Sequence, residues 1–141
     1  MNIKLYWTIG SQPSRAIRCL LLAGKVPHEA INVDFFKGEN RTPEMLKINP
    51  SGLIPFITVN DQSFFESAAI LRYLAQKFPS LNSYYPADLE QRAIIDAGLD
   101  FSATTLRPMI RNQFAPLLGS KETNTELSEF GKLTMADAKS K

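Results

Sequence analysis

The stretch Ile54-Pro55-Phe56-Ile57-Thr58-Val59 and the turn Asn60-Asp61-Gln62 behind it decide the fold of this chain. The apolar and β-branched residues predict a strand, and the turn leads into a second strand at residues 63–66. Ser67 then caps a helix whose apolar stripe consists of Ile70, Leu71, Leu74 and Phe78. A hairpin followed by an amphipathic helix is therefore expected over residues 54–78.

Strands and helices also alternate in the residues that precede this hairpin. Residues 3–7 and 30–35 have the composition of strands. Between them, Ser11 stands where it can cap a helix, and Pro13 lies in the first turn, where its missing N–H costs nothing. A further short helix opens at residues 42–44. The resulting order, βαβαββα, predicts an α/β fold with a mixed four-stranded sheet.

The pattern becomes purely helical from residue 88 onward. One face of this expected helix carries Ile94, Ala97, Phe101 and Thr105. Pro108 and Pro116 are expected to bend or end the helix, because each removes a backbone donor. We therefore expect four parts: an α/β domain at residues 1–80, a linker at 81–87, a partial all-α domain at 88–120 and a weakly structured tail at 121–141.

Composition and charge indicate a folded protein without a polyanionic partner. The 141 residues are 44% hydrophobic and 21% charged, which is typical of a chain that buries a core. The net charge is only +2, and neither half has a block of like charges. We therefore expect no binding to nucleic acid and none to a membrane. No apolar run approaches the roughly 18 residues of a membrane span.

The single cysteine, Cys19, and the single histidine, His28, exclude several kinds of site. An intramolecular disulfide needs two cysteines, and a soft-ligand metal site needs a cluster of such side chains. The first residues also lack a signal-peptide pattern. We expect a cytoplasmic protein that holds no metal. Cys19 is expected to be buried in the first helix, because free cysteines are commonly core residues.

The hydroxyl of Ser11 allows two interpretations. The structural one is an N-cap, which stabilises a helix by about 1 kcal/mol. The functional one is a hydrogen bond to a bound thiolate, because a helix N-terminus and a hydrogen-bond donor both lower the pKa of a thiol from about 8.5. In the second case Ser11 favours the nucleophilic form of the thiol and attacks nothing itself.

Pro55 and the pair Glu66-Ser67 also have a structural and a functional interpretation. Pro55 is either an edge residue or part of a cis Ile54-Pro55 bond. A cis bond would turn the backbone N–H and C=O of Ile54 outward, toward an extended peptide ligand. Glu66 and Ser67 form either a simple helix cap or a site for an amino-acid head group. In such a site the carboxylate docks on the helix start and the ammonium on Glu66.

Three segments taken together resemble the signature segments of glutathione S-transferases. They are Ser11-Gln12-Pro13-Ser14-Arg15-Ala16, Asn49-Pro50-Ser51-Gly52-Leu53-Ile54-Pro55 and Glu66-Ser67-Ala68-Ala69-Ile70-Leu71-Arg72-Tyr73-Leu74. Their spacing, Ser11 and the segment Thr104-Thr105-Leu106-Arg107 are similar to the theta class. The resemblance implies a thioredoxin-like first domain followed by a truncated all-α domain. Because no cysteine stands at position 11 or 14, the chain is not expected to be a thiol–disulfide oxidoreductase.

The resemblance also implies which residues act on glutathione. Ser11 activates the glutathione sulfur, and Arg107 assists in forming the thiolate. Ile54 pairs its backbone with the cysteinyl unit ahead of cis Pro55, whereas Glu66 and Ser67 hold the γ-glutamyl group.

The remaining glutathione-binding positions implied by the resemblance are Gln12, Asn40, Arg41 and Leu53. Asn40 and Arg41 match positions that hold the glycyl carboxylate, and Asn40 stands where a histidine is common. Leu53 replaces a frequent basic residue, which removes one possible partner of that carboxylate.

Three functions stay open from the sequence. The first is a theta-like transferase that joins glutathione, its co-substrate, to small electrophiles. The second is a non-catalytic glutathione-binding or protein-interaction module, and the third is a truncated product without an electrophile pocket. The apolar stripe around residues 94–101 is expected to lie in a homodimer or to make the chain prone to aggregation.

Overall fold

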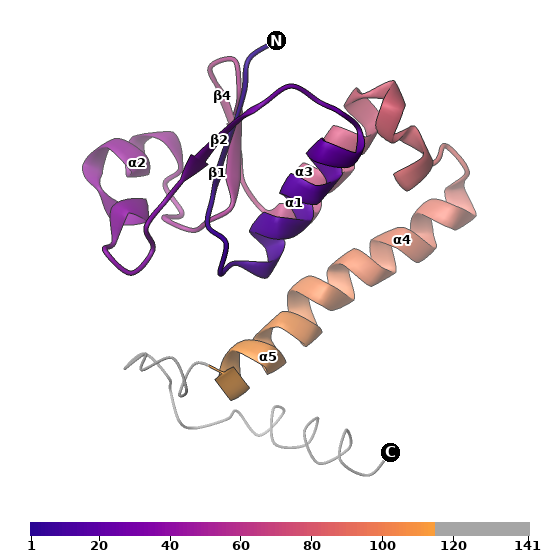
Figure 1. Cartoon of the computed structure of the whole chain (residues 1–141). Coiled ribbons are helices and arrows are strands. Elements are labelled where there is room, and N and C mark those ends of the chain that lie inside the picture. The colour runs from indigo at the N-terminus through magenta and orange to yellow at the C-terminus, as the bar shows by residue number, and fades with distance from the viewer. Residues whose placement is uncertain (115–141) are drawn as a thin grey trace. The chain divides into compact units, whose positions relative to one another are not determined.

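The computed structural model describes residues 1–114, which belong to two compact units, Met1–Ile95 and the part that starts at Asp96. The first unit contains a four-stranded sheet in the order β2-β1-β3-β4 (Figure 1). Strand β1 is parallel to β2, and β3 is antiparallel to both β1 and β4. The strand bounds are Ile3–Trp7 for β1, Glu29–Asn32 for β2, Phe56–Val59 for β3 and Gln62–Phe64 for β4.

Helices cover both faces of this sheet, and their order confirms the predicted thioredoxin-like arrangement. Helices α1 (Gln12–Ala23) and α3 (Ser67–Lys77) lie together on one face, and α2 (Pro43–Ile48) lies on the other (Figure 1). Two short 3-10 segments complete the first unit, η1 (Glu39–Arg41) before α2 and η2 (Pro79–Tyr84) after α3.

Two separate apolar cores follow from the alternation of side chains along the strands. On β1, Leu5 points toward α1 and α3, where it packs with Ile17 and Leu74. Its neighbour Tyr6 points the other way and stacks on Phe56, with ring centroids 4.2 Å apart. The α1/α3 face therefore has the larger core, and the α2 face has a small aromatic one.

Strand β2 ends earlier than the sequence predicts, at Asn32. The backbone turns after Val33, because side chains bond to backbone amides there. The Asp34 carboxylate accepts from the Lys37 amide at 3.1 Å, and the Glu39 carboxylate accepts from the Asp34 amide at 2.7 Å. These local bonds favour a turn over a longer strand.

Residues 81–87, which were expected to be a linker, begin as part of the first unit's core. Leu81 is fully buried and Tyr85 nearly so, and both belong to the cluster between the sheet, α1 and α3. The Ser80 hydroxyl also donates to the carbonyl of Gly24, at the end of α1, at 2.8 Å. Segment η2 is therefore packed against the first unit and hydrogen-bonded to it.

The helical part after this segment contains an unusual widened turn. Helix α4 (Leu89–Phe101) runs into a π-helical segment, η3 (Ser102–Leu106), and then into α5 (Arg107–Phe114). Pro108 lies just after the π segment, and proline has no N–H to continue α-helical bonding. Pro108 was expected to bend or end the helix, and it does not end it, because α5 continues to Phe114. Pro116 and the tail at residues 121–141 lie outside the described residues.

Helix α4 exposes much of its apolar stripe. None of its residues is buried, and Ile94 and Phe101 are 74% and 55% exposed, while Ile95 packs against the core of the first unit. Coverage of the stripe by a second copy stays a prediction. Within residues 1–114, no helix is long and apolar enough to cross a membrane.

Candidate functional site

The strand register brings the candidate residues from three segments to one edge of the sheet. Tyr6 pairs with Phe56, so the end of β1 meets the beginning of β3. Ile57 pairs with Phe64, so the end of β4 reaches the same edge. The loop to Ser11, the loop through Pro55 and the turn to Glu66 therefore converge there.

Ser11 is the N-cap of α1, as predicted. Its backbone is extended, with φ −86° and ψ 115°, and its Oγ accepts a hydrogen bond from the Ser14 amide at 3.3 Å. A hydroxyl has one proton to donate besides the lone pairs that accept. The cap therefore uses the oxygen of Ser11 and leaves its proton available, and the side chain is only half-buried.

The Ile54-Pro55 peptide bond is cis, which confirms that prediction. Pro55 is buried, whereas Ile54 is half-buried. Among the described residues, the backbone bonds of loops, turns and caps leave the amide and carbonyl of Ile54 unused. The backbone of Ile54 thus has a donor and an acceptor for a ligand.

Glu66 and Ser67 lie at the start of α3, but the prediction that Ser67 caps this helix was wrong, because the last non-helical residue is Glu66 and no side chain caps the helix there. Glu66 is exposed and has φ +67° and ψ 108°, a conformation that non-glycine residues rarely adopt. Ser67 follows as the first helical residue and is buried. Such backbone strain clusters at functional sites, which is consistent with a role of this turn in binding.

Asn40 and Arg41 differ in how they face solvent. Asn40 is 3% exposed, and its Nδ2 donates to the carbonyl of Gly52 at 2.6 Å. Arg41 is exposed, so its guanidinium is accessible to an anion. Leu53 is also exposed, and its carbonyl accepts from Asn49 Nδ2 at 2.8 Å. The glycyl-carboxylate role thus fits Arg41 better than Asn40.

The last two candidate residues lie on helices. Gln12 is exposed in the first turn of α1, next to Ser11. Arg107 begins α5 in the second unit, and its Nε donates to the Ser102 carbonyl at 3.3 Å, across the π segment. The role of Arg107 on a thiolate stays a prediction.

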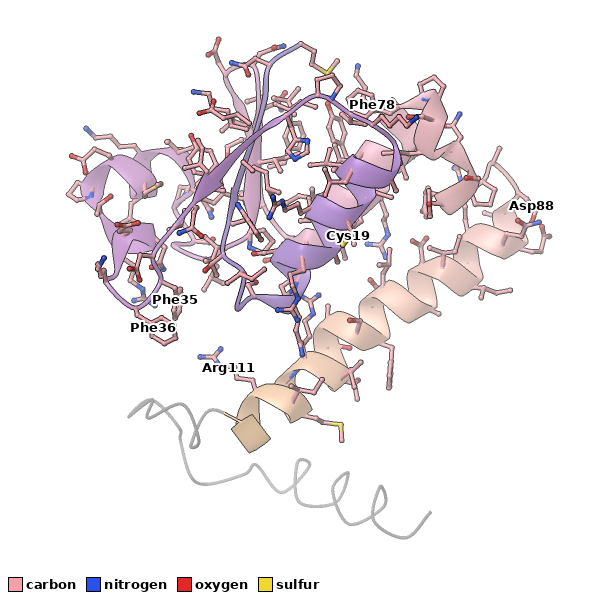
Figure 2. The ribbon with its side chains drawn as sticks, viewed as in Figure 1. Cys19, Phe35, Phe36, Phe78, Asp88 and Arg111 are labelled. Carbon is pink, nitrogen blue, oxygen red and sulfur yellow. The ribbon has the colours of Figure 1, made fainter. Side chains whose placement is uncertain are left out.

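Sequence reasoning missed two features of this edge. One is the bonding of the Asn49 side chain: Asn49 was named only as the first residue of a signature segment, although an asparagine before Pro50-Ser51 is a known signal for side-chain-to-backbone turns. The other is the pair Phe35 and Phe36, which project from the loop after β2 (Figure 2) and are 49% and 87% exposed. Phe35 was expected inside a strand.

Electrostatics in this loop come from one ion pair. Lys37 Nζ lies 3.1 Å from Asp34 Oδ2. The hydrogen bond with Lys37 lowers the pKa of Asp34 below 3.8, and the same bond raises the pKa of Lys37 above 10.5. No group of three or more His, Cys, Asp or Glu side chains within residues 1–114 is arranged to hold a metal.

The prediction for Cys19 was wrong. Its side chain is exposed on α1 (Figure 2), because the buried face of that helix is formed by Ser14, Ile17 and Leu21. A position two residues after Ile17 lies on the opposite side of a helix with 3.6 residues per turn.

Comparison with known proteins decides the family. Residues 1–76, more than half of the chain, match the family model described as glutathione S-transferase, N-terminal domain. The chain belongs to the glutathione S-transferase family. The cap at Ser11, the cis-proline loop and the start of α3 all lie within the matched residues.

Relatives of several classes are similar to this glutathione S-transferase. Glutathione S-transferase F10 of Arabidopsis thaliana is 35% identical, over 92% of this chain and 66% of that protein. Human glutathione S-transferase theta-2 is 34% identical, over 84% and 51%. The structure of an epsilon-class glutathione S-transferase from the housefly, Musca domestica, has a TM-score of 0.81 at 31% identity, over 96% and 62%.

These values leave the class open, because proteins outside the theta class match as well as a theta-class one. The chain also spans only about half to two thirds of the length of these relatives.

Proposed function

We propose that the chain binds glutathione at the edge formed by Ser11, Ile54 and Ser67 and activates its thiol for attack on small electrophiles, as a theta-like transferase. One observation carries the proposal: an N-cap hydroxyl, an unpaired cis-proline backbone and the start of α3 meet at one sheet edge. Membership of the family makes glutathione the natural ligand for that edge.

The proposed chemistry depends on the state of the sulfur. A free thiol has a pKa of about 8.5 and is mostly protonated at neutral pH. The Ser11 proton and the N-terminus of α1 both stabilise the thiolate, and one pKa unit corresponds to about 1.4 kcal/mol. The thiolate attacks the electrophilic carbon, the new S–C bond replaces the bond to the leaving group, and the displaced proton goes to solvent.

The rest of glutathione is recognised by its charges and its backbone. The Ile54 amide and carbonyl pair with the cysteinyl unit in the manner of a one-residue strand. The γ-glutamyl carboxylate docks at the N-terminus of α3, and its ammonium pairs with Glu66. Arg41 and Gln12 are the remaining contacts, Arg41 to the glycyl carboxylate and Gln12 beside the sulfur.

The test compares Ser11→Ala with Glu66→Ala in the full chain, with glutathione and a panel of alkyl halides. A hydrogen bond to a charged group contributes about 1.5–3 kcal/mol, so Ser11→Ala should lower turnover roughly 10- to 100-fold and change glutathione Kd little. Glu66→Ala should weaken glutathione binding while the chain stays folded.

A matched control separates the lost cap from the lost chemistry. Asp88 accepts from the Gln91 amide at 2.9 Å at the start of α4, so Asp88→Ala removes a cap elsewhere. If Asp88→Ala and Ser11→Ala lose the same turnover, the role of Ser11 is only to cap the helix. Glutathione binding by wild type without any turnover would favour the non-catalytic module instead.

A further inference from the structure

Two buried asparagine side chains hold consecutive carbonyl groups just before the cis-proline. Asn40 Nδ2 donates to the Gly52 carbonyl at 2.6 Å, and Asn49 Nδ2 donates to the Leu53 carbonyl at 2.8 Å. Asn40 is 3% exposed and Asn49 1%. We call Asn40 and Asn49 the asparagine clamp. Ile54, whose backbone is free for a ligand, is the next residue in the chain.

Asn49 also fixes the turn from its other side. Its Oδ1 accepts from the Ser51 amide at 3.2 Å and from the Ser51 hydroxyl at 2.9 Å. The Ser51 hydroxyl oxygen in turn accepts from the Leu53 amide at 3.2 Å. One buried amide thus connects the beginning of the turn to its end, and buried amides that lose their partners are costly.

The turn at residues 49–53, which both asparagine side chains bond to, is closely packed. Gly52 is buried with φ +61°, and a Cβ there would lie 3.3 Å from Leu46 Cδ2. The same Cβ would lie 3.5 Å from Arg41 Cγ. The turn therefore packs closely on η1 and α2, and the clamp sets the direction in which its carbonyls point.

We infer that Asn40 and Asn49 are positioning residues for glutathione, an inference that rests on the proposed function. They hold the Gly52 and Leu53 carbonyls inward, so that the Ile54 amide and carbonyl point toward the cysteinyl unit of the ligand. Asn40 then acts through the loop and makes no contact with the glycyl carboxylate. A misplaced backbone donor weakens binding strongly, because hydrogen bonds lose strength steeply with distance and angle.

Two ligands distinguish this role from a direct contact. Glutathione has the glycyl carboxylate, and γ-glutamylcysteine lacks the whole glycyl unit but keeps the cysteinyl unit that Ile54 would bind. Calorimetry on the full chain should show that Asn40→Ala and Asn49→Ala each raise Kd about 10-fold for both ligands, the effect expected for one lost hydrogen bond. A weaker affinity of Asn40→Ala for glutathione only would assign Asn40 to the glycyl carboxylate and overturn the inference.

Hydrogen exchange at the Gly52 and Leu53 amides, which donate to the Asn49 carbonyl and to the Ser51 hydroxyl, gives a readout that does not need a ligand. Exchange of these amides should be faster in Asn40→Ala and in Asn49→Ala than in wild type. The control is Ile3→Val, a core variant at the opposite end of β1, which should lower the unfolding midpoint but keep wild-type exchange and wild-type Kd. Unchanged exchange, or affinity losses that simply follow the unfolding midpoint, would overturn the inference. If Asn49→Ala does not fold, Ser51→Ala tests the same turn.

The proposed function and the clamp fail in different ways. Wild type that binds neither ligand refutes the proposed function, and the exchange data then decide whether the clamp holds the loop. If wild type binds the ligands and both asparagine variants bind them with the wild-type Kd, the proposed function is retained and the clamp is refuted.

Discussion

Gly24 is the position where one added methyl group should have the largest effect on the first unit. It follows α1 with φ −80° and ψ 0°, so alanine fits the backbone without strain. A Cβ at this position would, however, lie 2.5 Å from Leu81 Cδ2, 2.7 Å from Leu81 Cγ and 3.2 Å from Leu81 Cδ1. Leu81 is fully buried and cannot move away freely.

The two contributions to the stability of Gly24→Ala have opposite signs. Alanine restricts the unfolded chain and stabilises by about 0.4–1 kcal/mol where the backbone is compatible. Overpacking of a core usually costs about 1–3 kcal/mol, and here three atoms of one side chain overlap. The clash should prevail, with a net loss of about 2 kcal/mol and a decrease of roughly 6–10 °C in unfolding temperature.

Thermal and urea unfolding followed by circular dichroism measure this effect. Gly10→Ala is the matched control, because nothing lies within 4 Å of a Cβ there. In a double-mutant cycle, Leu81→Ala should remove most of the penalty of Gly24→Ala, because the overlapping atoms are gone. A Gly24→Ala protein as stable as wild type would refute the close packing of η2 on the end of α1.

Three further predictions follow from single side chains. Ser14 is fully buried, and its hydroxyl has no hydrogen-bond partner within the described residues, so Ser14→Ala should raise stability by roughly 1 kcal/mol in urea unfolding. Glu66→Gly should relieve the positive φ and raise stability by up to about 1 kcal/mol, yet weaken glutathione binding in calorimetry. The Asp34 pKa is lowered by Lys37, so its stabilising effect is present above pH 3.8 and is lost as pH falls further. The difference in unfolding midpoint between wild type and Asp34→Asn should therefore be constant near neutral pH and disappear in acid, whereas a constant difference would contradict the ion pair.

Local signals in the sequence were sufficient for most of the first unit. The cap at Ser11 has the expected side-chain bond, to the amide of Ser14, because a cap depends on residues within one turn. The short helix expected to open at residues 42–44 begins with a similar bond, from the Met45 amide to the Thr42 hydroxyl. The hairpin at residues 56–64 also formed as expected, because turn residues and β-branched residues act over a few positions. The cis bond before Pro55 was predicted from the local segment that ends at Ile54-Pro55.

Errors arose where burial depends on what packs from elsewhere. The Leu81 and Tyr85 side chains belong to the core although their segment has the composition of a linker, because α1 and α3 leave space for them. Cys19 is exposed although its type favours burial, because the helix phase places Ile17 and Leu21 inward. Residue type gives only a preference for burial. The packing of neighbouring elements determines which residues are in fact buried.

The sequence alone thus determined the element order, the cap at Ser11, the cis-proline loop and the family, because each depends on neighbours along the chain. The tertiary structure decided that Asn40 faces Gly52 and that Asn49 faces Leu53. Asn40 and Gly52 are twelve residues apart. A hydrogen bond across that separation depends on the packing of η1 and α2 against the loop, and no periodicity or propensity in the sequence encodes that packing.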